Sequence, residues 1–386
     1  MMKQTARFPC VSGLLQRLEN IPPWVLLLVA ALLYTPFTFL GYGSDSDSYG
    51  VVRTGQYFVE TLDYLPSRLP GYFVHETFVY FLNLVGGSLL SNLGTMGMAL
   101  LMLASFRKLC VRLQVPHPAL LTSILMVHPF VWVSATSTID YLWALGFAFL
   151  GFNLLYSKRY TAASIAMALA IGSRLSTVMV IGFFLVYVFV SLKEERRSVF
   201  FTAVAAFAIG LLLYIPALDF LEWDISRWLV LSTGDSSLWT PVLRAGRFLY
   251  KNLMFWGLPA AVWLVILVII AFFKRHDEQN IFRNGLTWLC LTIIIGVEVM
   301  FYRIPIEMEY LLPLLPFMLI LLGKVFPQQP KLLLVLFFLV LLSNFLWINP
   351  ARSITPNQTS SVVYGLWLEP GYLLQDVATR LALLKP

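Results

Sequence analysis

Two carboxylates two residues apart, Asp45 and Asp47, stand in the first long polar stretch of the chain, residues 41–85. At this spacing the pair can bind a hard cation such as Mg or Mn, or one carboxylate can act as a general base while the other tunes it. Gly, Ser and Asp also form turns, so a solvated turn is the alternative. Because the pair directly follows an apolar run, we predict that both acids are catalytic and that both can hold a metal ion.

Three arginines are candidates for binding phosphate, because a guanidinium forks onto phosphate oxygens. Arg68 lies in a loop fixed by two prolines and a glycine, although an ordinary surface arginine is the alternative. Arg174 lies between two apolar runs, where a charge is costly and marks a functional site unless the side chain snorkels to the headgroups. Arg303 precedes Glu307 and Glu309 in a short polar turn, which could instead hold a local Arg–Glu pair. We predict that all five side chains bind substrate.

Four further candidates lie close to turns. Asp140 follows a turn rich in Ser and Thr between two apolar runs, and the alternative is that it only caps a helix. Tyr72, His75 and Glu76 come near the end of the polar stretch, where residues 73–84 mix aromatic and polar side chains and suit an interfacial helix. We predict that Asp140 supports the catalytic acids and that the other three contact substrate.

The elements that must position these residues are membrane-spanning helices. The chain is 59% hydrophobic and only 12% charged, and its mean hydropathy is +0.78. A soluble domain has about twice that share of charged residues. Taking roughly 20 apolar residues for a span, we predict an all-α polytopic membrane protein with about eleven transmembrane helices. The predicted spans are 24–40, 86–106, 118–136, 139–156, 161–173, 175–192, 198–217, 253–273, 285–302, 311–323 and 331–348.

The charges between the spans predict the orientation. Lys and Arg gather in alternate connectors, which the positive-inside rule assigns to the cytoplasm, so the net charge of +7 is not a nucleic-acid signal. The first span has no small-residue cleavage site after it, so we predict that it is retained. The N-terminus is then cytoplasmic and the C-terminus is outside. We predict one transmembrane domain over 1–386, with outer segments 41–85, 218–252 and 349–386. The three cysteines show no metal or disulfide pattern.

The acidic stretch resembles the first outer loop of GT-C fold glycosyltransferases. Asp45, with Tyr49 and Gly50 following, has the spacing of the Asp-Glu motif of protein O-mannosyltransferases, although Ser46 replaces the Glu. An Arg-x-Pro-Gly-Tyr motif before the second span is also similar to these enzymes and to aminoarabinose transferases, and begins at Arg68. The resemblance implies that the donor is a sugar on a polyprenyl phosphate, that one loop Asp is the base or orients the acceptor, and that basic residues face the lipid phosphate.

We therefore expect a membrane glycosyltransferase that moves a sugar from a polyprenyl-phosphate donor to an acceptor hydroxyl on the outer face, with inversion. The expected acceptor is a lipid, a glycan or a protein, and the expected place is a bacterial inner membrane, where membrane lipids surround the chain. The acidic loop could bind a divalent cation such as Mg or Mn. Nucleic acid is not an expected partner. The alternatives are a lipid-linked polysaccharide polymerase or ligase, and a transporter or flippase, which should carry charges near the middle of the bilayer.

Overall fold

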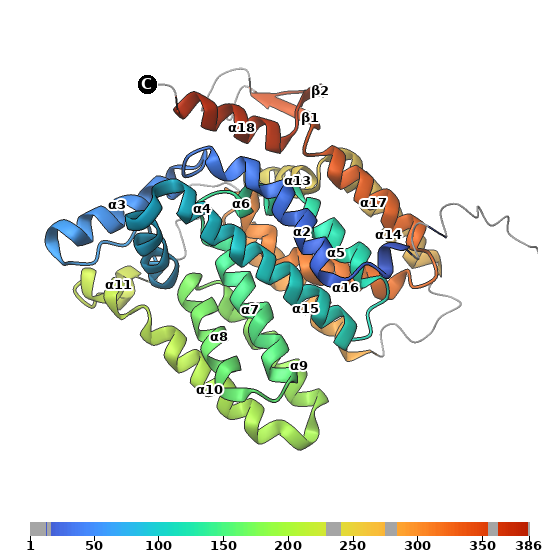
Figure 1. Ribbon diagram of the computed structural model, residues 1–386. Coiled ribbons are helices and arrows are strands. Elements are labelled where there is room, and N and C mark those ends of the chain that lie inside the picture. The colour runs from blue at the N-terminus through green and yellow to red at the C-terminus, as the bar shows by residue number, and fades with distance from the viewer. Residues whose placement is uncertain (1–12, 14–16, 229–240, 275–283, 354–361, 385–386) are drawn as a thin grey trace, which may run out of the picture.

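The computed structural model of the chain describes residues 13, 17–228, 241–274, 284–353 and 362–384. Almost all of the described elements are helices, with one two-stranded sheet near the C-terminus (Figure 1). In chain order they are α2 (Pro23–Tyr34), η1 (Thr35–Phe39), α3 (Ser46–Thr61), α4 (Phe73–Arg112), α5 (Pro118–Val127), α6 (Pro129–Ala135), α7 (Tyr141–Tyr156), α8 (Tyr160–Ser173), α9 (Thr177–Ser191), η2 (Lys193–Glu195), α10 (Arg196–Leu212), α11 (Ile215–Phe220), α13 (Pro241–Trp256), α14 (Leu258–Lys274), α15 (Gly285–Arg303), η4 (Met308–Leu314), α16 (Leu315–Val325), α17 (Pro330–Leu342), β1 (Leu346–Ser353), β2 (Val362–Pro370) and α18 (Tyr372–Leu383).

The all-α character predicted from the apolar runs is confirmed, and every predicted span contains a helix or a bent helix pair. By length and composition, four helices among the described residues can cross a membrane, or up to six if each bent pair is one span. Five more apolar helices have 10–17 residues, which is short for a crossing. The number of eleven spans therefore stays a prediction.

Two spans are bent by local sequence. A Pro at the start of α6 separates it from α5, and the two helices meet at 68°. α13 and α14 meet at 97° across Gly257, which has a φ of +76°. That left-handed conformation is open to Gly without strain, and a Cβ there would lie 2.3 Å from the Ser343 hydroxyl oxygen. The bend turns α13 sharply away from the direction of α14.

The helices α4, α7, α8 and α10 pack one on the next, and the ends of α4, α7 and α8 position part of the predicted site. α4 packs on α7, α7 on α8 and α8 on α10. The close approach of α4 and α7 depends on Gly146, because a Cβ at that position would lie 2.8 Å from the Met98 carbonyl oxygen. This packing brings the start of α7 close to the loop that precedes α4.

One sequence-based boundary needs correction, whereas one short predicted helix is present. Residues 73–84 are helical as predicted, and the non-helical backbone at Gly86 and Gly87 separates them from the rest of α4. The predicted span 331–348 ends early, because α17 stops at Leu342 and strand β1 follows. The segment 349–386, which was predicted to lie outside, contributes most of an antiparallel hairpin of β1 and β2 and all of α18. Residues 229–240 of the segment 218–252 lie outside the described part of the chain.

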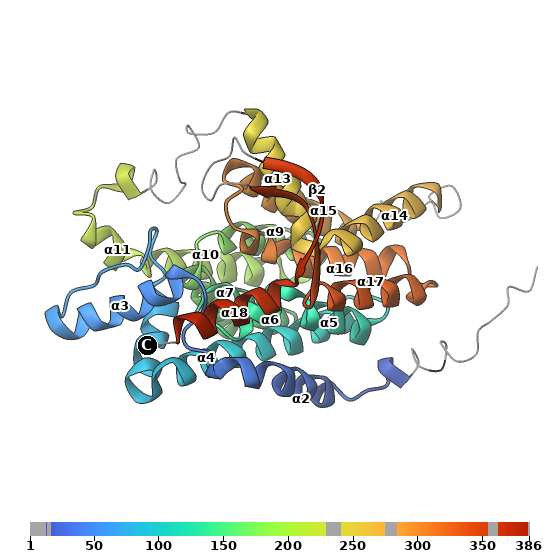
Figure 2. The same ribbon diagram turned by 90° about the horizontal axis from the view of Figure 1, so that it is seen from above.

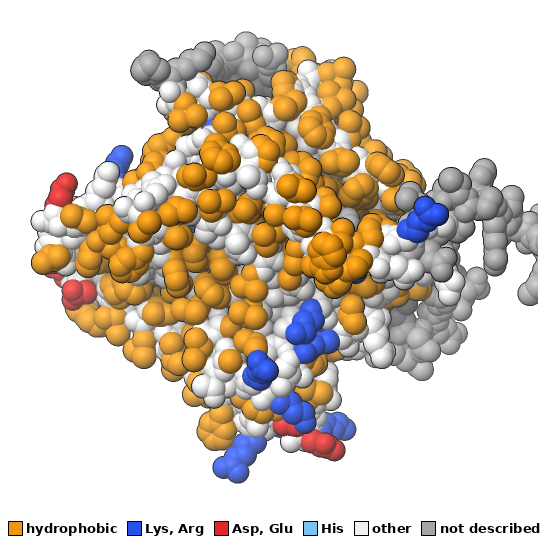
Figure 3. Space-filling model, viewed as in Figure 1, with side chains coloured by type: hydrophobic (Ala, Val, Ile, Leu, Met, Phe, Trp, Pro, Cys, Tyr) orange, Lys and Arg blue, Asp and Glu red, His pale blue; other side chains and the backbone are white. Residues whose placement is uncertain are grey.

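The surface matches a membrane protein. Hydrophobic side chains cover most of the face seen in Figure 3, and Lys and Arg gather at its lower edge, where the chain turns between α9 and α10. One exposed pair there joins Lys158 to Glu195, with the two charged atoms 2.5 Å apart. α3 and α11 lie at the other end of the bundle, and the hairpin and α18 lie along its top (Figures 1 and 2).

Candidate active site

The acid loop, which comprises residues 41–47, leads into the capped N-terminus of α3. Asp45 is the N-cap of α3, and its carboxylate accepts a hydrogen bond from the Asp47 backbone N–H at 3.0 Å. This is the usual role of an Asp at a helix start, since the first N–H groups have no partner inside the helix. Both carboxylates are half-buried. The two acids predicted from their spacing therefore leave the same helix end, with their backbone fixed.

A chain of alternating charges runs from Asp47 into the bundle. The Asp47 carboxylate pairs with Arg68, and the second amino group of Arg68 lies 2.6 Å from Oδ1 of Asp140. Oδ2 of Asp140 lies 2.6 Å from Nη1 of Arg174. Asp140 stands immediately before α7 and Arg174 immediately after α8, so helix packing brings together residues that are far apart in sequence. Three of the predicted site residues thus meet at Asp140.

Aromatic rings enclose the two guanidiniums. Arg174 lies 3.8 Å from the ring centre of Tyr141 and 5.4 Å from that of Tyr310. The ring centre of Tyr72, another predicted residue, lies 4.7 Å from Arg68 and 5.7 Å from Arg174. Cations over aromatic faces at such distances are stabilised by the ring quadrupole. Both arginines are therefore held by paired charges and by rings.

The charge state of Asp140 follows from this environment. Its side chain is only 3% exposed, and burial alone would raise its pKa. The guanidiniums of Arg174 and Arg68 outweigh that effect and hold the pKa of Asp140 below its usual value. Asp140 is therefore ionised at neutral pH and cannot act as a proton acceptor without breaking the pair.

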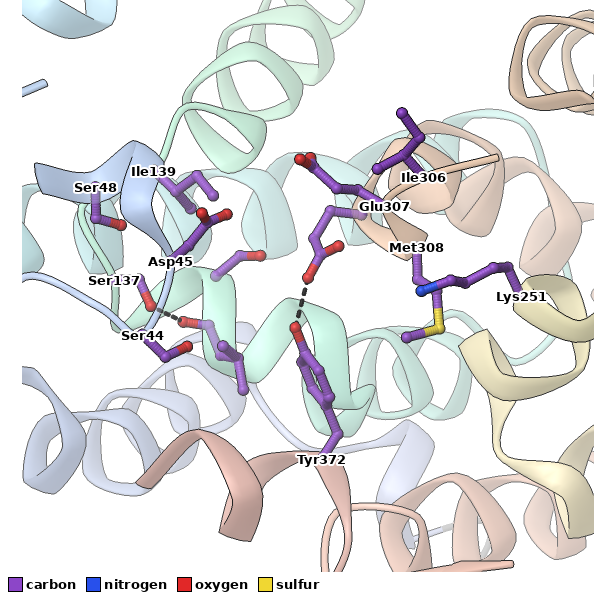
Figure 4. Close-up of a pocket in the computed structure, with 13 residues that line it drawn as sticks. Ser44, Asp45, Ser48, Ser137, Ile139, Lys251, Ile306, Glu307, Met308 and Tyr372 are labelled. Carbon is purple, nitrogen blue, oxygen red and sulfur yellow. Dashed lines mark hydrogen bonds between the residues drawn. The ribbon is translucent and has the colours of Figure 1, made fainter. Parts of the chain in front are cut away.

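A cavity of about 300 Å³ lies beside this network. Asp45, Lys251, Glu307, Glu309 and Tyr372 contribute polar groups to its wall. Figure 4 shows the carboxylates of Asp45 and Glu307 facing the same space, and Lys251 reaching toward it from α13. The pocket connects to the charge network because the Tyr141 hydroxyl, under Arg174, donates to Glu307 at 2.9 Å.

Asp45, Asp47 and Glu307 form a carboxylate cluster that fits a hard cation. Each offers one oxygen, and the three oxygens lie within 4.8 Å of one another. Mg and Mn prefer such oxygen ligands. Asp47 already neutralises Arg68, so the charge left for a cation comes mainly from Asp45 and Glu307.

The other predicted residues lie elsewhere. Glu76 accepts hydrogen bonds from Tyr64, and from the backbone N–H of Ser67 at 2.9 Å. It thus holds together the loop between α3 and α4 that carries Arg68. His75 is fully buried, and its ring centre is 5.7 Å from that of Trp143. Arg303 is exposed at the end of α15, and it neither lines the pocket nor joins the Asp140 network. The predicted substrate contacts of these three residues stay untested.

Lys251 and Tyr372 are two of the pocket residues that were not predicted from the sequence. Lys251 lies on α13 within the outer segment 218–252, and the amphipathic pattern of that helix was the available signal. Tyr372 comes from the C-terminal tail, and its hydroxyl donates to Glu309 at 2.5 Å. Nothing in the tail sequence points to the pocket, because the contact depends on the turn back of the chain after β2.

Comparison with solved structures supports the fold. The chain is similar to the crystal structure of ArnT from Cupriavidus metallidurans bound to undecaprenyl phosphate, with a TM-score of 0.54 and 13% sequence identity. The similarity covers 79% of this chain and 60% of that one. The fold is thus that of a GT-C aminoarabinose transferase, as the acidic loop implied. No protein-family model and no curated protein matches the chain.

Proposed function

We propose that the protein is a membrane glycosyltransferase that moves a sugar from a polyprenyl-phosphate donor to an acceptor hydroxyl. The observation that carries the proposal is the pocket, where Asp45, which has no ion-pair partner among the described residues, faces Lys251 and Glu307 within a GT-C fold. A proton acceptor and a cation on one cavity are what displacement of a phosphate by an alcohol needs. The ArnT structure held undecaprenyl phosphate, which supports a lipid of that class.

The proposed reaction is a single displacement. The acceptor oxygen attacks C1 of the sugar and forms the new C–O bond, while the bond from C1 to the phosphate oxygen breaks. The acceptor proton passes to Asp45, and the bonding electrons leave with the lipid phosphate. Inversion at C1 follows from one displacement. Asp45 is favoured over Asp47 as the base because the Arg68 pair occupies Asp47.

We assign two of the three predicted arginines a role that differs from the predicted one. Arg68 and Arg174 are bound to Asp47 and Asp140, so we assign them to holding the acid loop on the bundle rather than to the phosphate. Lys251 is the better phosphate ligand, since its ammonium makes no hydrogen bond or ion pair with the residues that the structure describes. Burial lowers the pKa of Lys251, so its charge gains from an anionic ligand.

Substitution of Lys251 with Gln should weaken the binding of undecaprenyl phosphate about tenfold, since a hydrogen bond to a charged group contributes roughly 1.5–3 kcal/mol. The measurement is the thermal shift of the purified protein during titration with undecaprenyl phosphate. Lys193→Gln is the matched control, because Lys193 is an exposed lysine in the connector before α10. Equal affinities for Lys251→Gln and wild type would remove Lys251 from the phosphate site.

A divalent cation is an optional part of this proposal. Asp45, Asp47 and Glu307 would hold Mg or Mn. Such an ion supplies charge stabilisation to a departing phosphate. Dependence on the metal is an experimental question with two defined outcomes.

The proposed orientation places the pocket on the outer face. Basic connectors lie at the opposite end of the bundle from α3, which supports a cytoplasmic N-terminus and an outer acid loop. A bacterial inner membrane is the proposed location, and a lipid, glycan or protein hydroxyl is the proposed acceptor.

One experiment tests the function and the face together. Polyprenyl-phosphate sugars are added to right-side-out and to inverted vesicles that contain the protein, and released polyprenyl phosphate and glycosylated acceptor are measured, with and without EDTA. We expect transfer in right-side-out vesicles only. Sugar movement across the membrane without release of polyprenyl phosphate would instead identify a transporter. Loss of transfer in EDTA, restored by Mg or Mn, would establish the metal.

A further inference from the structure

The C-terminal helix α18 buries an ion pair in the side that faces the bundle. Arg380 is 0% exposed and Asp376 is 5% exposed, and Nε of Arg380 lies 2.8 Å from Oδ2 of Asp376. The remaining surface of the helix carries exposed leucines, among them Leu374 and Leu381. Charged residues are almost never fully buried unless they are paired. The buried Asp376–Arg380 pair therefore calls for a reason, and its hydrogen bonds to the bundle suggest one.

The pair connects two segments of the site that are distant in sequence. Nη1 of Arg380 donates to the Thr136 carbonyl oxygen at 2.8 Å, and Nη2 donates to the Ser137 hydroxyl. Asp376 accepts a hydrogen bond from the Ser44 hydroxyl at 2.6 Å. Thr136 and Ser137 belong to the link between α6 and α7, whereas Ser44 belongs to the acid loop.

The bonded residues are close neighbours of the charges at the site. Ser44 directly precedes Asp45, and Ser137 lies three residues before Asp140. The two segments also touch through their backbones, because the Thr138 N–H donates to the Tyr42 carbonyl oxygen at 2.7 Å. The first residue of the same helix, Tyr372, lines the pocket and binds Glu309.

An apolar contact would hold α18 on the bundle without the desolvation free energy that buried charges cost. Burying two charges is unfavourable unless their geometry is good and further hydrogen bonds satisfy them, and replacing such a pair with apolar residues often preserves or increases stability. Hydrogen bonds are directional, however, and fix the position of the groups that make them. The buried pair thus fits a need for position better than a need for stability.

We propose that α18 is a positioning element of the site: Asp376 and Arg380 hold the Ser44–Asp45 segment against the 136–137 segment, so that Asp45 faces the pocket. The inference rests on the proposed function, because the position of Asp45 matters for catalysis only if Asp45 is the base. Asp376 and Arg380 are positioning residues, since they act through Ser44 and Ser137 and do not line the pocket. Figures 1 and 2 show α18 lying along the bundle, and α18 packs on α6.

The test uses the full chain with Ser44→Ala, Asp376→Asn and the double variant. Ser44→Ala breaks the link to the loop without leaving a buried charge, so it keeps the test valid if Asp376→Asn folds poorly. Thr379→Ala is the control, because Thr379 is exposed on the same helix and, among the described residues, its hydroxyl bonds only to the Gln375 carbonyl oxygen one turn away. The readouts are kcat and KM for sugar transfer, and hydrogen exchange of peptides 41–48 and 133–140.

We expect Ser44→Ala and Asp376→Asn to lower kcat by about 10- to 100-fold with little change in KM, since a misplacement of about 1 Å can cost 100-fold. The double variant should be no slower than Asp376→Asn alone, because both changes remove one link. Exchange should rise in peptides 41–48 and 133–140 only. Thr379→Ala should match wild type in every readout.

Two results would overturn the inference. One is an unchanged kcat in Ser44→Ala and Asp376→Asn. The other is a fall in kcat with faster exchange throughout the protein, which would mean that α18 only stabilises the fold. If the wild type transfers no sugar, the proposed function fails, and hydrogen exchange alone decides whether the pair holds the loop.

Discussion

Asp140→Asn should cost the protein about 3–5 kcal/mol of folding free energy, because it leaves the buried guanidinium of Arg174 without its carboxylate and removes one of the two carboxylates that pair with Arg68. Asn fills the same space, so the loss measures charge rather than packing. The low pKa of Asp140 has the same origin: the ionised form is favoured in the folded state, so its stabilisation is present above the unfolded pKa and is lost as the pH falls through the folded pKa. The measurement is thermal unfolding in detergent at neutral pH.

The loss of stability should be partly reversible by a second substitution. A second substitution, Arg174→Met, removes the guanidinium that Asp140→Asn leaves without an ion-pair partner and should recover part of the lost stability, since an apolar replacement of a buried pair is often tolerated. Asp63→Asn is the control, because Asp63 is an exposed acid of the same outer segment. If Asp140→Asn unfolds at the wild-type temperature, the network does not hold the site together.

Most of the helical framework could be predicted from the sequence. Apolar runs of about 20 residues and basic connectors are strong signals, because a bilayer demands both. The end of α17 was predicted too late because the strand that follows it begins with Leu346, Trp347 and Ile348, which continue the apolar run. The turn into a strand depends on pairing with β2, which is a contact distant in sequence.

The site was predicted less completely, for a related reason. Asp45 and Asp47 are close in sequence, so their proximity needed no fold. The partners of Arg174 could not be predicted, because Asp140 reaches it only through the packing of α7 on α8. Arg303, which was predicted to reach the phosphate, is exposed at the end of α15, and that prediction stays untested. Lys251 in the pocket and the pair in α18 depend on bends and turns that hydropathy does not report.

Asp45→Asn should lower kcat for sugar transfer by about 100- to 10,000-fold, which is the usual contribution of a general base. The structure makes this substitution unusually clean. Asp45 caps α3 by accepting from the Asp47 N–H, and an Asn side-chain oxygen caps a helix as well as Asp does. The fold and the thermal unfolding temperature should therefore stay at wild-type values, so that a fall in kcat reports the lost proton acceptor.

The matched controls separate the base from its neighbours. Glu60→Gln, an exposed acid near the far end of the same helix, should leave transfer unchanged. Asp47→Asn should lower stability together with activity, because Arg68 then loses one of its ion-pair partners. If Asp45→Asn keeps full transfer while it remains folded, Asp45 is not the base. Glu307, the other carboxylate of the cluster that faces the pocket, then becomes the residue to test, and Tyr141 becomes the group that tunes it.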